Sequence, residues 1–156
     1  MENILVYAIS IGIALLVGGL SALITGGSMG LYEDIIPPPL APPSWLFPVV
    51  WTFLFILMGI SAAMIYNDRK ASMAQKKSAL YTYALSLIVN FFWSIIFFNL
   101  RAFFFAFIWL VLLLYLIINT ILKYYKIKPL AAYLQIPYAI WVSFAGYLTL
   151  AIWILN

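Results

Sequence analysis

Long apolar stretches without charge dominate the pattern along the chain. Residues 3–32, 35–67, 78–100, 102–122 and 129–156 contain no Asp, Glu, Lys or Arg. A helix of about 20 apolar residues crosses roughly 30 Å of hydrocarbon, and each of these windows is long enough to supply one. The fourth window is apolar almost throughout and does not alternate apolar with polar residues, which argues against the strands of a membrane barrel.

The pattern therefore predicts an all-α integral membrane protein, a single domain over residues 1–156 built as a bundle of five transmembrane helices. The expected helices cover residues 4–24, 46–66, 80–98, 103–122 and 130–155. The first of them begins after Glu2 instead of after a basic residue, and its apolar run is too long for a signal peptide. We expect this first helix to be retained.

Composition agrees with a membrane environment. Hydrophobic residues make up 67% of the chain and charged residues only 8%, whereas an ordinary soluble domain has about a quarter of its residues charged. These few polar side chains are not enough to cover the outer surface of a protein in water. We therefore expect most of the outer surface to face lipid.

The net charge of +4 reflects topology and does not indicate a nucleic-acid partner, because the basic residues are split among short segments. Residues 69–77 and 123–128 hold all of them except Arg101, and five spans place both segments on one side of the membrane. The positive-inside rule then puts the N-terminus in the cytoplasm of a bacterial-type plasma membrane and the C-terminus outside.

The chain has neither cysteine nor histidine. Zinc sites of the usual kind, histidine-based triads and the common axial ligands of haem iron are therefore excluded, and we expect neither a metal site nor a resident cofactor. The charge-free spans offer no acid or base for conventional catalysis or for coupled transport.

The connection over residues 26–45 is rich in proline. Six of the eight prolines lie between Pro37 and Pro48. Proline fixes φ and lacks an N–H, so this stretch should be stiff and extended. It is either a rigid connector that starts the second helix or a lid over a cavity, and the flanking Trp45 and Trp51 favour the lid.

Three helices present aromatic and polar side chains at helical spacing. Asn90 and Trp93 share a face of the third helix, Trp51 and Phe55 share one of the second, and Tyr138 and Trp141 share one of the fifth. An asparagine in hydrocarbon needs a partner, so Asn90 should face a cavity or another helix. Interhelical packing alone would also explain these faces.

Small residues at Gly18, Ala22 and Gly26 form a stripe that permits close helix approach. The partner is either another helix of this chain or a second copy, and we expect a homodimer.

Several motifs resemble those of the translocator protein (TspO/MBR) family, which includes the peripheral-type benzodiazepine receptor and the tryptophan-rich sensory protein. They are the Pro-Pro-Ser-Trp run at 42–45, Phe-Pro-Val-Val-Trp at 47–51, Asn-Phe-Phe-Trp-Ser at 90–94 and Pro-Tyr-Ala-Ile-Trp at 137–141. The resemblance extends over nearly the whole chain, in order and with the same five-helix spacing.

The resemblance implies a receptor or sensor that binds porphyrins such as protoporphyrin IX, and isoquinoline carboxamide or benzodiazepine-type ligands, in a pocket beneath the first loop. Passive transport of porphyrin or another lipophilic small molecule, or a non-catalytic scaffold, are the alternatives. Some bacterial members are reported to promote light-dependent porphyrin breakdown, and Trp51 and Trp141 match the tryptophans involved. The candidate ligand-binding residues are Tyr32, Pro42, Trp51, Phe55, Asn90, Trp93, Tyr138, Trp141, Ala145 and Leu148.

Overall fold

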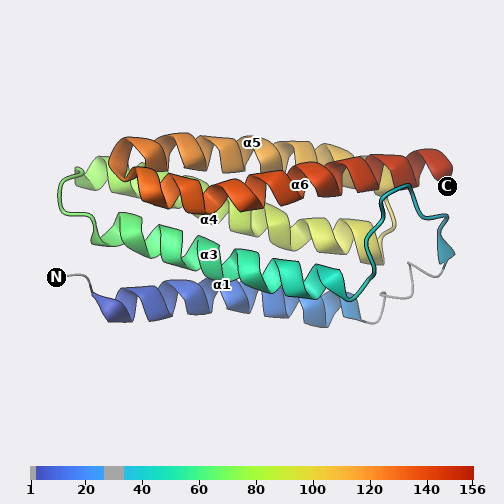
Figure 1. Ribbon diagram of the computed structural model, residues 1–156, viewed down its shortest axis with the longest axis horizontal. Coiled ribbons are helices and arrows are strands. Elements are labelled where there is room, and N and C mark those ends of the chain that lie inside the picture. The colour runs from blue at the N-terminus through green and yellow to red at the C-terminus, as the bar shows by residue number, and fades with distance from the viewer. Residues whose placement is uncertain (1–2, 27–33) are drawn as a thin grey trace.

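The computed structural model describes residues 3–26 and 34–156 as a bundle of long helices (Figure 1). The elements are α1 (Ile4–Thr25), α3 (Leu46–Asn67), α4 (Met73–Ser94), the π-helical segment η2 (Ile95–Asn99), α5 (Phe103–Ile127) and α6 (Pro129–Leu155). With η2 continuing α4, five helices are long and apolar enough to cross a membrane, and the described ranges contain no strand. The predicted five-helix membrane class is confirmed.

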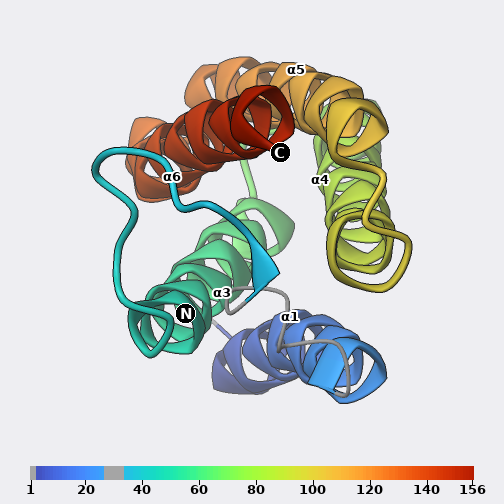
Figure 2. The same cartoon turned by 90° about the vertical axis from the view of Figure 1, so that its right-hand side faces the viewer.

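The helices stand side by side in a ring when the bundle is viewed from its end (Figure 2). Their order around the ring is α1, α3, α6, α5 and α4, and the most extensive contacts join α5 to α6, α1 to α3 and α4 to α5. Among the neighbours in this ring, α1 and α4 touch least. We call the boundary between α1 and α4 the α1–α4 seam.

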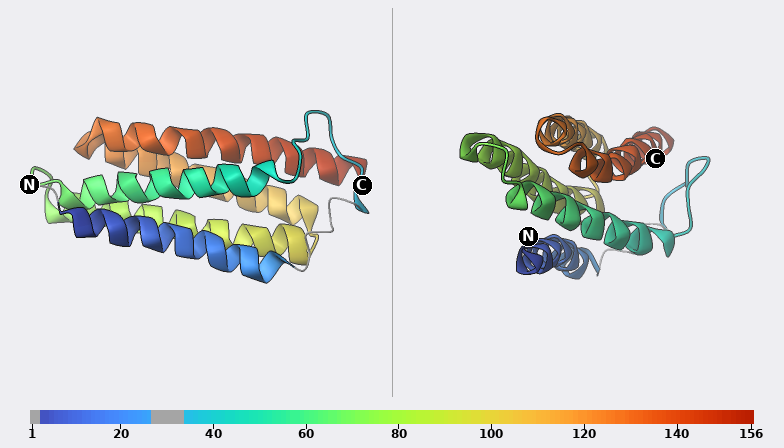
Figure 3. Two further views of the ribbon diagram at one scale, coloured as in Figure 1. Left: turned by 60° about the horizontal axis from the view of Figure 1, so that its bottom comes forward. Right: turned by 60° about the vertical axis from the view of Figure 1, so that its left-hand side comes forward.

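Helix α1 lies at the edge of the bundle (Figure 3). In its most apolar stretch only 6% of the residues are buried, against 50% in α3. Large side chains such as Ile4, Leu16 and Leu23 are exposed on α1, and every other spanning helix also exposes some. An outer surface of this kind suits lipid, where exposed apolar side chains cost nothing.

Two helices are longer than the sequence analysis expected. Helix α4 begins at Met73, not at residue 80, because Ser72 and Gln75 form a capping box: the Gln75 amide donates to Ser72 Oγ at 3.1 Å and the Ser72 amide to Gln75 Oε1 at 3.0 Å. Helix α5 continues past residue 122 to Ile127. A change in charge marks where hydrocarbon ends, whereas helices continue until a cap or a break.

Glycines allow α1 and α3 to approach closely. A Cβ on Gly59 would lie 2.5 Å from the Ile11 Cα, and a Cβ on Gly18 would lie 2.5 Å from the Phe55 ring. The Gly18 part of the small-residue stripe therefore packs inside the chain, while a Cβ on Gly26 would meet nothing within 4 Å. Homodimerisation stays a prediction.

The two ends of the bundle differ in charge. The N-terminus and the connection between α3 and α4 lie at one end, and the C-terminus and the connection that leads into α3 lie at the other (Figure 1). All lysines and Arg69 lie at the first end, which we call the basic end. Arg101 lies at the second end, which we call the lid end.

Candidate functional site

The proline-rich segment 34–45, here called the lid, folds over the end of α6 (Figures 1 and 2). The side chain of Asn156 holds Ile36 twice, since Oδ1 accepts from the Ile36 amide at 2.9 Å and Nδ2 donates to the Ile36 carbonyl at 3.3 Å. The Tyr147 hydroxyl donates to the carbonyl of Pro39 at 2.7 Å. These hydrogen bonds show that the segment covers the bundle and does more than connect two helices.

A salt bridge fixes the other side of the lid. Arg101, in the connection between η2 and α5, pairs with Asp34 at 3.1 Å, and both side chains are about half exposed. Arg101 adopts a left-handed backbone with φ of 51°. Neither Arg101 nor Asp34 lines a cavity at the lid end, so the space beneath the lid is uncharged over the described residues.

A cavity of about 280 Å³ lies on the α1–α4 seam near the lid end; we call it the larger chamber. Four of the candidate ligand-binding residues line it: Trp51, Phe55, Asn90 and Trp93. Helix α1 contributes its small residues, including Gly18, Gly19 and Ala22. Because small side chains on α1 face aromatic rings on α3 and α4, the packing leaves space between them.

A smaller chamber of about 30 Å³ lies directly beneath the lid. Its walls include Pro42 from the lid, Trp93 from α4, and Ala145 and Leu148 from α6, all of them candidate residues. Phe47 and Trp93 line both chambers. These two rings therefore stand between the two spaces.

Aromatic rings of α3 and α6 pack against one another behind the chambers. The Trp51 ring lies 6.5 Å from that of Trp141 at an interplanar angle of 87° and stacks on Phe55 at 5.7 Å. The Phe47 ring meets Trp141 edge-on at 5.7 Å. Such pairs stabilise the wall by about 0.5–1.5 kcal/mol each beyond the area that they bury.

Asn90 and Tyr138 join α4 to α6 through the centre of the bundle. The Asn90 amide donates to the Tyr138 hydroxyl at 2.9 Å, and both residues are buried. Tyr138 and Trp141 do not line either chamber; Tyr138 is fully enclosed, and Trp141 packs behind Trp51 and Phe47. Tyr32, also a candidate, lies outside the described residues.

Two indole N–H groups near the chambers have no acceptor. Nε1 of Trp93 and Nε1 of Trp141 are buried, and neither donates a hydrogen bond to any described residue. By contrast, Trp109 Nε1 on α5 donates to the Val89 carbonyl at 2.7 Å. An unpaired buried donor is costly in an apolar interior, so an acceptor that reached either indole would gain a hydrogen bond.

Sequence reasoning missed two features of this region. Phe47, which separates the chambers, lies one helical turn before Trp51, and that spacing was a usable signal. The π-helical turn η2, which brings Phe97 and Phe98 to the chamber walls, has no comparable signal. Single π-helical turns are rare and occur often at functional sites.

Comparisons of the sequence with known proteins identify the family. Residues 10–154 match the model of the TspO/MBR family. The chain belongs to the TspO/MBR family. Its relatives include the tryptophan-rich protein TspO of Chlorobaculum tepidum, which is 34% identical over 99% of this chain and 98% of that protein.

Two further TspO/MBR relatives carry other names. The translocator protein of Bos taurus is 31% identical over 78% of this chain and 72% of its own length. The tryptophan-rich sensory protein of Cereibacter sphaeroides is 29% identical over 73% of this chain and 69% of its own length. Family membership and the five apolar helices together make this chain an integral membrane protein.

Proposed function

We propose that this chain is a membrane receptor or sensor whose lid-end chambers bind a flat, lipophilic small molecule of the porphyrin, isoquinoline carboxamide or benzodiazepine type. The observation that carries the proposal is the uncharged aromatic cavity beside the lid, with Trp93, whose buried indole donor is unpaired, in the walls of both chambers. Aromatic walls bury and stack on a planar ligand, while a few donors fix its orientation. The name of the Cereibacter sphaeroides relative is consistent with a sensory role.

The size of the cavity sets a condition on the ligand. The larger chamber, at about 280 Å³, is near the lower end of the roughly 300–1,000 Å³ that small-molecule pockets occupy. A two-ring or three-ring ligand suits that range, whereas a porphyrin disc is larger than either chamber, and the smaller chamber adds only about 30 Å³. Porphyrin binding therefore requires Phe47 to turn aside and the lid to lift, because Phe47 lines both spaces.

Titration of purified protein with protoporphyrin IX tests the proposal, with the absorbance of the porphyrin as the signal. We expect Trp93→Phe to weaken binding about tenfold, since it removes a hydrogen-bond donor and part of the wall that both chambers share. Trp141→Phe should weaken binding less, because Trp141 packs behind that wall. Trp153→Phe is the matched control, because Trp153 is half exposed and packs on Phe104 away from both chambers. Equal affinities in all three variants would refute the site.

Passage through the centre of the bundle, the alternative function, receives no support from the packing below the chambers. Fully buried side chains of Met58, Ile65, Tyr124 and Tyr138 fill the middle of the bundle. Because the larger chamber lies on the α1–α4 seam, we expect a lipophilic molecule to leave it toward lipid. Flux of protoporphyrin IX into sealed vesicles measures passage directly, and we expect the protein to bind without raising the flux.

Light-dependent porphyrin degradation is a second candidate activity, favoured by the contact of the Trp51 and Trp141 rings. In this hypothesis the excited porphyrin takes one electron from an indole, and dioxygen is the oxidant that completes ring opening. Phenylalanine at both positions should keep binding measurable and abolish the loss of porphyrin absorbance in light and air. A loss at the rate of the unmodified protein would exclude these tryptophans.

We also propose that the basic end faces the cytoplasm of a bacterial plasma membrane, with the lid outside. The support is the gathering of all lysines and Arg69 at one end of the bundle, where the positive-inside rule expects the cytoplasmic side.

A further inference from the structure

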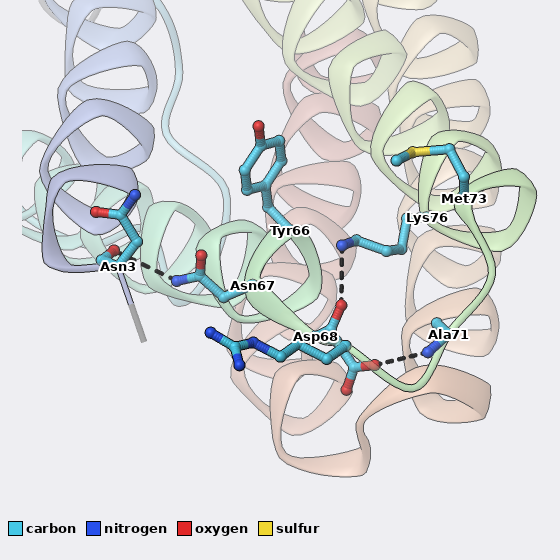
Figure 4. Close-up of a pocket in the computed structure, with 8 residues that line it drawn as sticks. Asn3, Tyr66, Asn67, Asp68, Ala71, Met73 and Lys76 are labelled. Carbon is cyan, nitrogen blue, oxygen red and sulfur yellow. Dashed lines mark hydrogen bonds between the residues drawn. The ribbon is translucent and has the colours of Figure 1, made fainter. Parts of the chain in front are cut away.

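Three adjoining hollows form a groove at the basic end of the α1–α4 seam, far from the lid. They share Tyr66 at the end of α3, and we call them together the basic-end groove. Figure 4 shows its polar mouth, where Tyr66, Asn67 and Asp68 lie between Asn3 on one side and Met73 and Lys76 on the other. The groove continues from this mouth along α1 and α4 into the apolar part of the bundle.

Cationic side chains line the mouth. Lys76 and Lys77 from the first turns of α4 border one hollow, and Arg69 borders the next. The Lys76 amine donates to the Asp68 carbonyl at 2.9 Å and lies 5.5 Å from the centre of the Tyr66 ring, which holds it at the groove. An ammonium group has three donors, so this bond leaves Lys76 able to bind an anion as well.

One carboxylate, that of Asp68, is also part of the mouth. Its Oδ1 accepts from the backbone amides of Lys70 and Ala71, both at 2.9 Å. The carboxylate is thus engaged in holding the turn between α3 and α4. Three cations and one carboxylate line the mouth, and the N-terminus of α4 adds partial positive charge.

The deep part of the groove is apolar. This hollow of about 350 Å³ lies between Val6, Ile9 and Ile13 of α1, Ala62 and Ala63 of α3, and Leu80 and Tyr83 of α4. The Ser10 hydroxyl in its wall already donates to the Gly59 carbonyl at 2.7 Å. The close approach of Gly59 to Ile11 holds α1 against α3 beside this hollow, so the groove is preformed.

We propose that the basic-end groove binds one anionic phospholipid, with its phosphate at Lys76 and Lys77 and one acyl chain along Ile9 and Ile13. The positions of the lining residues indicate a lipid as the ligand. Cations lie at the end of the bundle, where lipid headgroups are, and apolar side chains lie toward the membrane centre. A soluble anion would use only the mouth. A zwitterionic headgroup would bring its own cation against the lysines.

Charge, and not chain length, should give the selectivity. An acyl chain in the groove exchanges one apolar environment for another, so it gains little over bulk lipid. Each lysine near an anionic headgroup contributes about 1 kcal/mol. Two lysines therefore predict a preference for anionic over zwitterionic lipid of at least about tenfold.

The test uses the purified full chain in detergent with dioleoyl phosphatidylglycerol, dioleoyl phosphatidylcholine or the chain-free headgroup glycerophosphoglycerol, and counts retained molecules by native mass spectrometry. We expect phosphatidylglycerol to be retained at least about tenfold better than phosphatidylcholine, and the free headgroup not to compete. Equal retention of the two lipids overturns the proposal. Competition by the free headgroup overturns it too, because it indicates a site for soluble anions.

Substitutions of lysine test whether the preference for anionic lipid arises in the basic-end groove. We expect Lys76→Gln with Lys77→Gln to remove the preference, and Lys77→Gln alone to reduce it severalfold without disturbing the bond from Lys76 to Asp68. Lys126→Gln with Lys128→Gln removes the same charge at the same end but outside the groove, and should keep the preference. Loss of the preference in this control would mean diffuse attraction and would overturn the site.

A last variant tests the apolar part. Ile13→Trp fills the deep hollow from a half-exposed position on α1, so the fold should tolerate it. We expect it to lower retention of phosphatidylglycerol severalfold. Unchanged retention would show that no acyl chain enters the groove and would overturn the proposed lipid pose.

Discussion

At the residue scale, Asn90 is the polar side chain that most needs its partner. It is 4% exposed in a helix that faces hydrocarbon, and its amide donates to the Tyr138 hydroxyl. An amide buried without a hydrogen bond costs several kcal/mol in an apolar medium. The sequence predicted that Asn90 must face a cavity or another helix; the structure shows that it does both, because Asn90 also lines the larger chamber.

A double-mutant cycle measures this hydrogen bond. We expect Asn90→Leu and Tyr138→Phe each to lower the free energy of unfolding by about 1–2 kcal/mol, with a coupling of about 0.6–1.7 kcal/mol between them. Unfolding in mixed micelles gives the four values. Asn119→Leu is the control and should be nearly neutral, because among the described residues the Asn119 amide bonds to Tyr115 on its own helix. A coupling near zero would contradict a buried pair.

Gly18 and Gly12 form a matched pair on α1, because Gly18 lines the larger chamber and Gly12 does not. A Cβ at Gly18 would lie 2.5 Å from the Phe55 ring, whereas a Cβ at Gly12 would meet nothing within 4 Å. Gly18→Ala should therefore push Phe55 into the chamber, weaken binding of a benzodiazepine-type ligand severalfold and cost about 1–3 kcal/mol of stability.

Gly12→Ala should leave binding unchanged and stabilise α1 by about 0.5–1 kcal/mol, since alanine favours a helix over glycine. Ligand titration and thermal unfolding of both variants check this pair. Equal effects of the two substitutions would contradict the described contact between Gly18 and Phe55.

At the element scale, the sequence predicted the number of spans and the lid but not where α4 begins. Charge-free windows reflect the thickness of hydrocarbon, and Lys76 and Lys77 made the third window begin too late. The Ser-x-x-Gln capping box at residues 72–75 was visible in the sequence and would have placed the start at Met73. The fastening of the lid was not predictable, because the contact of Asn156 with Ile36 depends on the packing of α6.

The fastening of the lid by Asn156 should control how long a ligand stays bound. Asn156→Ala removes both side-chain hydrogen bonds to Ile36, so the lid should open more often and ligand dissociation should become about two- to tenfold faster. Stopped-flow displacement of bound protoporphyrin IX gives the rate.

Asn67→Ala serves as the control for the lid experiment. It removes an asparagine at the basic end, where the Asn67 amide donates to the Asn3 carbonyl at 3.4 Å. The dissociation rate of this variant should equal that of the unmodified protein. If Asn156→Ala left the rate unchanged as well, the lid would not be the barrier to release.

At the scale of the whole molecule, the α1–α4 seam explains why cavities occur where they do. The ring of helices is tightest between α5 and α6 and loosest between α1 and α4, and both the larger chamber and the basic-end groove lie on that loose boundary. Residue spacing predicted which side chains share a helix face. It could not predict that Phe47 and Trp93 divide the space in two, since that division depends on the mutual rotation of three helices.

Orientation in the membrane is the property of the whole molecule that follows most directly from its charge. The chain has no cysteine, so a single introduced thiol reports its own position without further changes. Leu40→Cys places the thiol on the lid, where Leu40 is 82% exposed, and Lys126→Cys places it on an exposed site at the basic end. In intact bacterial cells a membrane-impermeant maleimide should label the thiol at position 40 and leave the thiol at position 126 unlabelled. Both thiols should react once detergent opens the membrane. The reverse pattern would mean that the lysines face outward, so the positive-inside rule would fail for this chain and the lid would open toward the cytoplasm.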